Sequence, residues 1–344
     1  MEEEIGLYRP GDETEILNLF GRVFGENRDM ALWKWENQQN PRGESIIALL
    51  HSGERIRAHL CLQQILLHIR GREVPAAQRI NTMMEEECRG SGWFAPLLKL
   101  QLEEAQKRGV ELIYSFPNHT ALRALQRSGE VTELGEVPHY IKVLRAKEAA
   151  HRAAPHRLFA SIFLRIALSA ATLFKNRRRG NGSRTRRLWE FDGRFDELWK
   201  QAGESFGITT ARCSSFLNWR YRDCPREYLL FERPRGEKGT GGYIVLRFLE
   251  NVCYILDLLA LDRECLLDLL DRAEDEARVR SCSALSCWCL DGGRVSSLLK
   301  ELGYMRRKSK TTFVFTNIQC PEDIKGELEN RSSWYIMLGD SDYV

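Results

Sequence analysis

The chain has 344 residues, of which 43% are hydrophobic and 10% aromatic, with 51 basic and 48 acidic side chains. This composition excludes a disordered or collagen-like protein, because those classes lack the apolar side chains that build a core. The length favours two globular domains over one. The ten cysteines include no Cys-x-x-Cys pair and the seven histidines are scattered, so we expect reduced, buried thiols and no metal site.

The first elements succeed one another with clear turn signals. The acidic start, Met1-Glu2-Glu3-Glu4, is not typical of a secretory leader, so we expect a cytoplasmic protein. Apolar residues at helical spacing predict a helix over 13–24. The other expected elements are a strand over 5–9, a helix over 30–39, and antiparallel strands over 45–50, 55–68 and 73–84.

The next stretch, residues 88–94, reads Cys-Arg-Gly-Ser-Gly-Trp-Phe and leads into a helical pattern over 97–108. Two glycines before a helix predict a tight turn whose backbone N–H groups face outward at the positive end of the helix dipole. Such a turn can hold the diphosphate of a nucleotide-bearing cofactor. An ordinary strand-to-helix connection has the same spacing, so this pattern alone leaves both interpretations open.

The order of elements after this turn narrows the choice. A strand is expected over 110–116, then Pro117-Asn118, a short helix over 120–127, and Gly129. This order resembles the GNAT (GCN5-related) acyl-CoA N-acyltransferase superfamily. Residues 89–92 match its Arg/Gln-x-x-Gly-x-Gly/Ala loop, although Phe94 replaces the last small residue. Asn118, Ala121 and Gly129 match its Asn-led helix, whereas Leu125 replaces the tyrosine that many members use as a general acid.

The resemblance implies a donor and a set of binding residues. The donor would be an acyl-CoA, most simply acetyl-CoA. The residues that it assigns to the donor are Met83, Met84, Arg89, Gly90, Ser91, Gly92, Trp93, Phe94 and Asn118, with Met83 and Met84 acting through their backbone.

An amine nucleophile must lose a proton, so a base near the loop is expected. Glu85, the first of three adjacent glutamates, is one candidate, although such a run is also typical of a solvated turn. Tyr140 and His119 are further candidate acid or base groups.

Positive charge is concentrated in the middle of the chain. Residues 145–187 hold twelve Lys or Arg and one Glu, a net +11 that leaves −8 for the remainder of a chain whose total is +3. This distribution argues against nucleic-acid binding by the folded parts. Residues 157–174 form an apolar helical pattern with one polar stripe, roughly 25 Å long and too short to span a bilayer. The pattern fits either packing on the protein or peripheral contact with a membrane through residues 157–187.

The second half repeats the first. Residues 215–225 resemble residues 31–41, strands are expected over 227–233, 243–249 and 252–260, and a helix over 263–280. Asp291 stands where Asn118 stood, and Gly303 where Gly129 stood. The turn over 261–265 has no glycine and contains Asp262, an acid that would repel phosphate, so we expect no cofactor there.

We therefore predict an α/β (α+β) protein with two tandem GNAT-like domains, each a mixed, mostly antiparallel twisted sheet flanked by helices. The predicted boundaries are a CoA-binding domain over 1–145, a basic helix and linker over 146–187, a second domain over 188–316 and a tail over 317–344. The expected acceptor is a small-molecule or glycan amine, possible classes being amino sugars or envelope precursors. A tRNA-dependent aminoacyl transferase and a non-catalytic CoA-binding protein are the alternatives; the sequence does not indicate an oligomeric state.

Overall fold

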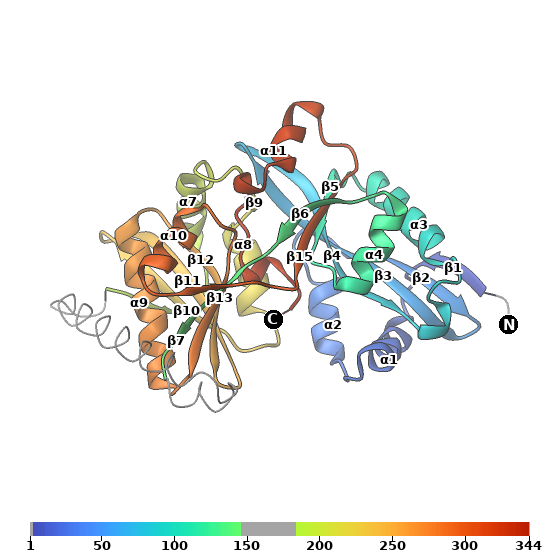
Figure 1. Ribbon diagram of the computed structural model, residues 1–344, viewed down its shortest axis with the longest axis horizontal. Coiled ribbons are helices and arrows are strands. Elements are labelled where there is room, and N and C mark those ends of the chain that lie inside the picture. The colour runs from blue at the N-terminus through green and yellow to red at the C-terminus, as the bar shows by residue number, and fades with distance from the viewer. Residues whose placement is uncertain (1–2, 146–183, 344) are drawn as a thin grey trace. The chain divides into compact units, whose positions relative to one another are not determined.

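The computed structural model describes residues 3–145 and 184–343 (Figure 1). The predicted helix over 157–174 lies outside the described residues. The chain divides into two compact units, each assembled from separate stretches of sequence. Unit 1 comprises Met1–Glu136, Phe206–Arg226 and Lys310–Trp334, and unit 2 comprises Val137–Ser205, Glu227–Ser309 and Tyr335–Val344.

Unit 1 is built on one mixed sheet. Among the described residues its strand order is β1-β2-β3-β4-β5-β15-β6, with β9 paired to β3. The β4–β5 pair is parallel and the other pairs are antiparallel. The strands are β1 (Glu3–Leu7), β2 (Ile46–Ser52), β3 (Arg55–Ile69), β4 (Arg72–Met84), β5 (Leu112–Ser115), β6 (Thr132–Glu136), β9 (Ile208–Thr210) and β15 (Thr312–Asn317).

Helices cover both faces of this sheet because side chains alternate along its strands. On one face Ile47 and Leu49 of β2 pack with the helices α1 (Glu13–Phe24) and α2 (Met30–Asn37). On the other face Ala48 and Leu50 pack with α3 (Phe94–Lys107). The remaining helices of unit 1 are α4 (His119–Ser128), α8 (Ser214–Leu217) with its continuation Asn218–Arg222, and α11 (Lys325–Glu329).

Unit 2 repeats this plan. Its described strands run in the order β14-β7-β13-β12-β11-β10-β8, with β12–β13 parallel and the other pairs antiparallel. They are β7 (His139–Val143), β8 (Arg186–Leu188), β10 (Leu229–Arg235), β11 (Gly239–Leu249), β12 (Val252–Ala260), β13 (Ala284–Trp288) and β14 (Met305–Arg307). The helices are α7 (Gly193–Gly203), α9 (Arg263–Val279) and α10 (Arg294–Glu301). The prediction of an α+β fold with two mixed, mostly antiparallel sheets is confirmed.

The chain exchanges strands between the two sheets, which the sequence did not indicate. The strand β15, from the end of the second half, lies between β5 and β6 in unit 1. Conversely, β7 leaves the first half and lies between β13 and β14 in unit 2. The contiguous boundaries predicted at 145 and 316 therefore differ from the units, because strand pairing joins segments that are distant in sequence.

Two further predicted segments differ from the structure. Residues 186–188, expected in the linker, form β8 and pair with β10. The segment 206–226, expected in the second domain, belongs to unit 1. There Trp219 stacks on Trp35 with ring centroids 5.1 Å apart, and each indole N–H donates to the other residue's carbonyl. This reciprocal contact joins the two segments that the sequence repeat had paired.

None of the helices in the described part of the chain combines the length and hydropathy needed to cross a lipid bilayer. All ten cysteines lie in the described residues, and none of them forms a disulfide there; nine are buried and Cys213 is partly exposed. The C-terminal stretch is packed, since Trp334, Ile336 and Met337 are each less than 5% exposed.

Candidate functional site

The site begins where two strands part. The parallel pairing of β4 with β5 runs from Ala76–Leu112 to Arg79–Ser115. There β5 ends, whereas β4 continues to Met84. Along its last residues β4 therefore has no described pairing on the β5 side, and backbone N–H groups on that edge are available to a ligand.

A bulge lies in this same part of β4. Its pairing with β3 passes from His59–Met83 to Cys61–Ile80, so that Asn81 and Thr82 both stand opposite Leu60. Asn81 has a φ of 46°, and its carbonyl accepts a 2.8 Å hydrogen bond from His59 Nδ1. Burial lowers the pKa of His59 to about 4, which keeps this imidazole neutral. The hydrogen bond from His59 on β3 thus stabilises the bulge in β4.

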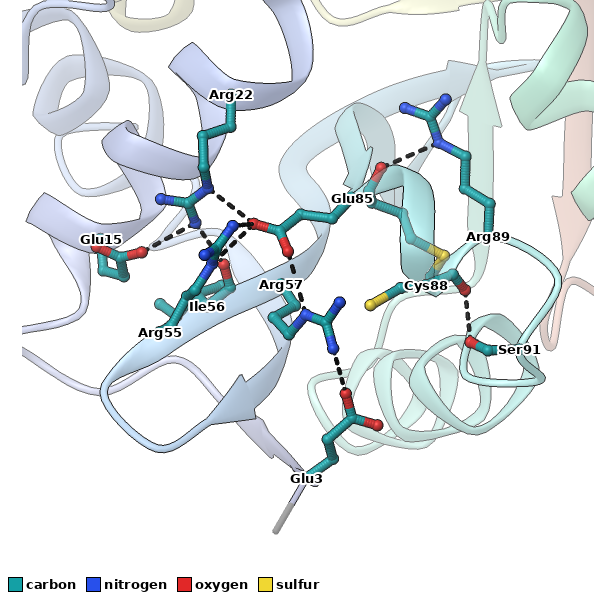
Figure 2. Close-up of polar contacts among 11 residues, drawn as sticks. Glu3, Glu15, Arg22, Arg55, Ile56, Arg57, Glu85, Cys88, Arg89 and Ser91 are labelled. Carbon is teal, nitrogen blue, oxygen red and sulfur yellow. Dashed lines mark hydrogen bonds and ion pairs between the residues drawn. The ribbon is translucent and has the colours of Figure 1, made fainter. Parts of the chain in front are cut away.

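The glycine turn comes directly after β4. Beyond the 3₁₀ turn Glu86–Cys88, Gly90 and Gly92 have φ values of 83° and 93°, a left-handed backbone that favours glycine. A Cβ atom built on either glycine would meet no atom within 4 Å, so the backbone faces open space. Arg89 Nε donates to the Met84 carbonyl over 3.1 Å, which leaves the rest of its guanidinium outside that bond (Figure 2). Ser91 Oγ instead donates to the Cys88 carbonyl, 2.6 Å away, and stabilises the turn itself.

The two helices after the turn differ at their first residues. No side chain caps the start of α3, and Pro96 has no N–H, so the N–H groups of its first turn that remain available to an anion are those of Phe94 and Ala95. The helix α4 is capped by Asn118, whose side-chain oxygen accepts from Ala121 N over 3.0 Å. In unit 2 the helix α9, which matches α3, is capped by Asp262, whose carboxylate accepts from Cys265 N over 2.8 Å. The acid predicted in the second copy therefore caps α9 with its own carboxylate.

These elements enclose a cavity of about 740 Å³ in unit 1. Its walls come from the end of α1, the free end of β4, the glycine turn, the start of α3 and one face of α4. Among the predicted donor-binding residues, those that line it are Met84, Arg89, Gly90, Gly92, Phe94 and Asn118.

The other predicted donor-binding residues lie off the cavity wall. Met83 is 1% exposed and packs in the core with the residues of α1 and α2. Trp93 packs with the core beneath α3, and Ser91 holds the turn. Only backbone atoms of Met83 could still serve the donor, as the resemblance implied.

The structure argues against Glu85 as a base. Its side chain is 5% exposed and accepts hydrogen bonds from Arg22 Nε at 2.8 Å, Arg55 Nη2 at 2.6 Å and Arg57 Nε at 3.1 Å (Figure 2). Burial would raise the pKa of this carboxyl, but the hydrogen bonds from Arg55 and Arg57 outweigh it and lower the pKa. A carboxylate held ionised by three arginines is a poor proton acceptor, so Glu85 serves the scaffold.

Tyr140 and His119 lie in different units. Tyr140 is on β7 of unit 2, buried, where its hydroxyl donates to Asp291. Burial first, and then this hydrogen bond, raise the pKa of the phenol. Since only unit 1 residues line the cavity, Tyr140 is not part of it. His119, the first residue of α4, does line the cavity.

Part of the cavity lining was not expected from the sequence. Val23 and Phe24, at the end of α1, form an apolar wall, and Thr82 adds the bulge of β4. Arg123 and Arg127 line it from α4. Their spacing of four residues on an expected helix was a readable signal, because it places both on one face. Nothing in the sequence pattern indicated that α1 would lie beside the turn.

Comparison with known proteins agrees with this geometry. Residues 4–128 match the acetyltransferase (GNAT) domain family. None of the curated protein sequences matches the chain significantly. Among solved structures, a GCN5-related N-acetyltransferase from Anabaena variabilis is similar, with a TM-score of 0.64 and 13% identity over 92% of this chain and 73% of that one. One from Kribbella flavida has a TM-score of 0.60 and 17% identity over 91% and 71%.

A third similar structure is the N-myristoyltransferase of Saccharomyces cerevisiae with bound myristoyl-CoA. Its TM-score is 0.62, with 12% identity over 92% of this chain and 79% of that one. At such identities the structures show a shared fold and no more. The family match, the strand separation and the glycine turn all fall in the same part of the chain. Residues 4–128 therefore form an acetyltransferase domain of the GNAT family, in a chain whose second sheet repeats its order of strands and helices.

Proposed function

We propose that the protein is an acyl-CoA-dependent N-acyltransferase that transfers an acyl group, most simply acetyl, to a primary amine. The observation that carries this proposal is the uncapped glycine turn at the wall of a cavity that opens where β4 and β5 separate. The turn supports binding of a diphosphate, and the unpaired edge of β4 supports binding of an amide-containing arm in extended form.

The reaction needs little covalent participation by the protein. The amine nitrogen attacks the thioester carbonyl carbon, the carbon–sulfur bond breaks, and coenzyme A leaves as a thiolate that takes up a proton. The amine must first lose a proton, and the carbonyl oxygen gains negative charge in the transition state. Backbone N–H groups near the bulge of β4 would stabilise that oxygen, while the cavity orients the two reactants.

The source of the proton for the leaving sulfur differs from many relatives. Leu125 occupies the usual tyrosine position and is 2% exposed, packed in the core beside α3. No phenol can act from that position. Of the candidate groups, His119 is on the cavity wall and is our candidate for this proton.

For the acceptor we propose an amino sugar or envelope precursor, met at the cytoplasmic face of a membrane. The support is the basic, apolar stretch over 157–187, which is suited to contact with anionic headgroups. This part of the proposal rests on sequence alone.

Calorimetric titration with acetyl-CoA tests the assignment of the turn. We expect micromolar binding by the wild type and none by Gly92→Glu, because the carboxylate would enter the diphosphate position. Gly109→Glu is the matched control: Gly109 also has a positive φ, of 74°, and open space around it, but lies outside the cavity lining. Equal affinity in wild type and Gly92→Glu would overturn the assignment.

Binding and turnover measurements on the wild-type protein distinguish the alternative functions. Acetyl-CoA binding without turnover across a panel of primary amines would favour a non-catalytic CoA-binding protein. No acetyl-CoA binding together with tight binding of charged tRNA would favour an aminoacyl transferase.

A further inference from the structure

The α4 wall of the cavity carries two arginines that no side chain in the described part of the chain neutralises. Arg123 and Arg127 are both exposed, lie four residues apart on α4 and line the cavity. Neither guanidinium forms a hydrogen bond or ion pair with any described residue. Like charges at this spacing on a helix repel each other, so the arrangement is unfavourable unless an anion lies against it.

The charged residues that line the cavity are all positive. It contains three arginines, Arg89 on the glycine turn and the two on α4, and no aspartate or glutamate. Glu103 and Glu130 line a separate hollow that Arg127 also borders, without pairing with it within 4.0 Å. The cavity is therefore suited to a ligand that carries negative charge near α4 as well as near the turn.

At the N-terminus of α4 the Asn118 side chain already accepts from Ala121 N, which takes up one of the N–H groups of the first turn. Arg123 and Arg127 come after that turn and are the charged groups of this wall that would meet an anion. Planar guanidiniums form paired hydrogen bonds with phosphate oxygens, and a phosphomonoester carries close to two charges at neutral pH.

We propose that Arg123 and Arg127 bind the 3′-phosphate on the ribose of the CoA donor, as a second anionic subsite beside the diphosphate turn. This inference rests on the proposed function, since it specifies which CoA-type ligand the same cavity selects. It makes the protein discriminate between acyl-CoA and donors that contain the diphosphate but lack the ribose phosphate.

Titration with acetyl-CoA and with acetyl-3′-dephospho-CoA tests the subsite. We expect the wild type to prefer acetyl-CoA by at least about tenfold, with a preference that weakens as salt is raised. In Arg123→Gln and Arg127→Gln the affinity for acetyl-CoA falls and the preference shrinks, while the affinity for the dephospho donor stays near that of the wild type. Lys107→Gln, which removes one exposed charge from α3 outside the cavity lining, should leave the preference unchanged.

The possible results distinguish an error in the 3′-phosphate subsite from an error in the proposed function. If both donors bind the wild type equally and Gly92→Glu abolishes both, the subsite is wrong and the diphosphate turn is right. If the arginine variants weaken both donors alike, the two side chains do not recognise the 3′-phosphate and the proposal is overturned. If acetyl-CoA does not bind the wild type at all, the proposed function and this inference fail together.

Discussion

Glu85 links the end of β4 to two other elements through its three arginine partners. Arg22 comes from α1, and Arg55 and Arg57 come from β3. Arg22 and Arg57 also pair with Glu15 and Glu3, at 2.9 and 2.7 Å, so that the charges balance locally (Figure 2). The network lies immediately before the glycine turn and fixes where that turn begins.

Replacing Glu85 by Gln should destabilise the protein by about 1–3 kcal/mol, the usual effect of removing one partner from a buried, charge-assisted hydrogen-bond network. Urea denaturation followed by circular dichroism measures the change. Glu86→Gln is the control, because that neighbouring side chain is exposed. Equal stability of the two variants would show that the network contributes nothing.

The same network should make the free energy of unfolding depend on pH. Because the folded-state pKa of Glu85 is lowered, its contribution to stability is complete above the unfolded-state pKa of about 4.3 and is lost as the pH falls through the folded-state value. Between about pH 5 and pH 3 the wild type should therefore lose stability more steeply than Glu85→Gln. Parallel pH profiles would contradict this.

At the scale of elements, β15 decides whether the sheet of unit 1 is continuous. It pairs with β5 on one side and β6 on the other, and Phe313 at its start is fully buried. That ring stacks on Phe116 at 5.3 Å and meets Trp334 edge-on at 4.9 Å. A segment nearly two hundred residues beyond β5 therefore completes the core behind the cavity.

We expect Phe313→Ala to destabilise unit 1 by about 3–5 kcal/mol, since a large buried ring is removed. Hydrogen exchange should quicken at the amides of β5 and β6 more than in unit 2. Trp189→Ala, which removes a ring that is 73% exposed, is the control and should cost far less. Unchanged exchange in β5 and β6 would show that β15 does not stabilise unit 1.

The pair α3 and α9 shows how one element can keep its shape and change its chemistry. Both come after a sheet strand that runs parallel to the next strand, β4 or β12. Two left-handed glycines precede α3 and leave its first turn uncapped, whereas Asp262 caps α9. A capped helix forms without a ligand, so the second copy retains the fold and loses the anion site.

At the scale of the whole molecule, membrane contact through residues 157–187 stays a prediction from sequence. Replacing Arg177, Arg178 and Arg179 by Gln should weaken binding to anionic vesicles by about 1 kcal/mol per residue, or roughly a hundredfold in total. Flotation of the full chain with anionic and with neutral vesicles measures this. Absence of the wild type from anionic vesicles would favour packing of the segment on the protein instead.

The sequence by itself determined the local features. Backbone sterics and side-chain periodicity act within a few residues. They allowed prediction of the turn with Gly90 and Gly92, the apolar spacing of α1 and α3, and the turn before α4. Comparing such local patterns along the chain revealed the repeat between the two halves. The family resemblance that these features support implied six residues that line the cavity, and the acid at position 262 led us to expect no cofactor in the second copy.

Tertiary structure alone decided the features that depend on which distant segments meet. The exchange of β7 and β15, the capture of Glu85 by three arginines and the wall formed by Phe24 all arise from strand pairing and packing across long sequence separations. The sequence pattern of β5 does not specify which strand pairs with its second edge, and several strands of the chain would fit it equally well. The physical reason is that hydrophobic burial and hydrogen-bond pairing are non-specific locally, and only the complete set of contacts selects one partner.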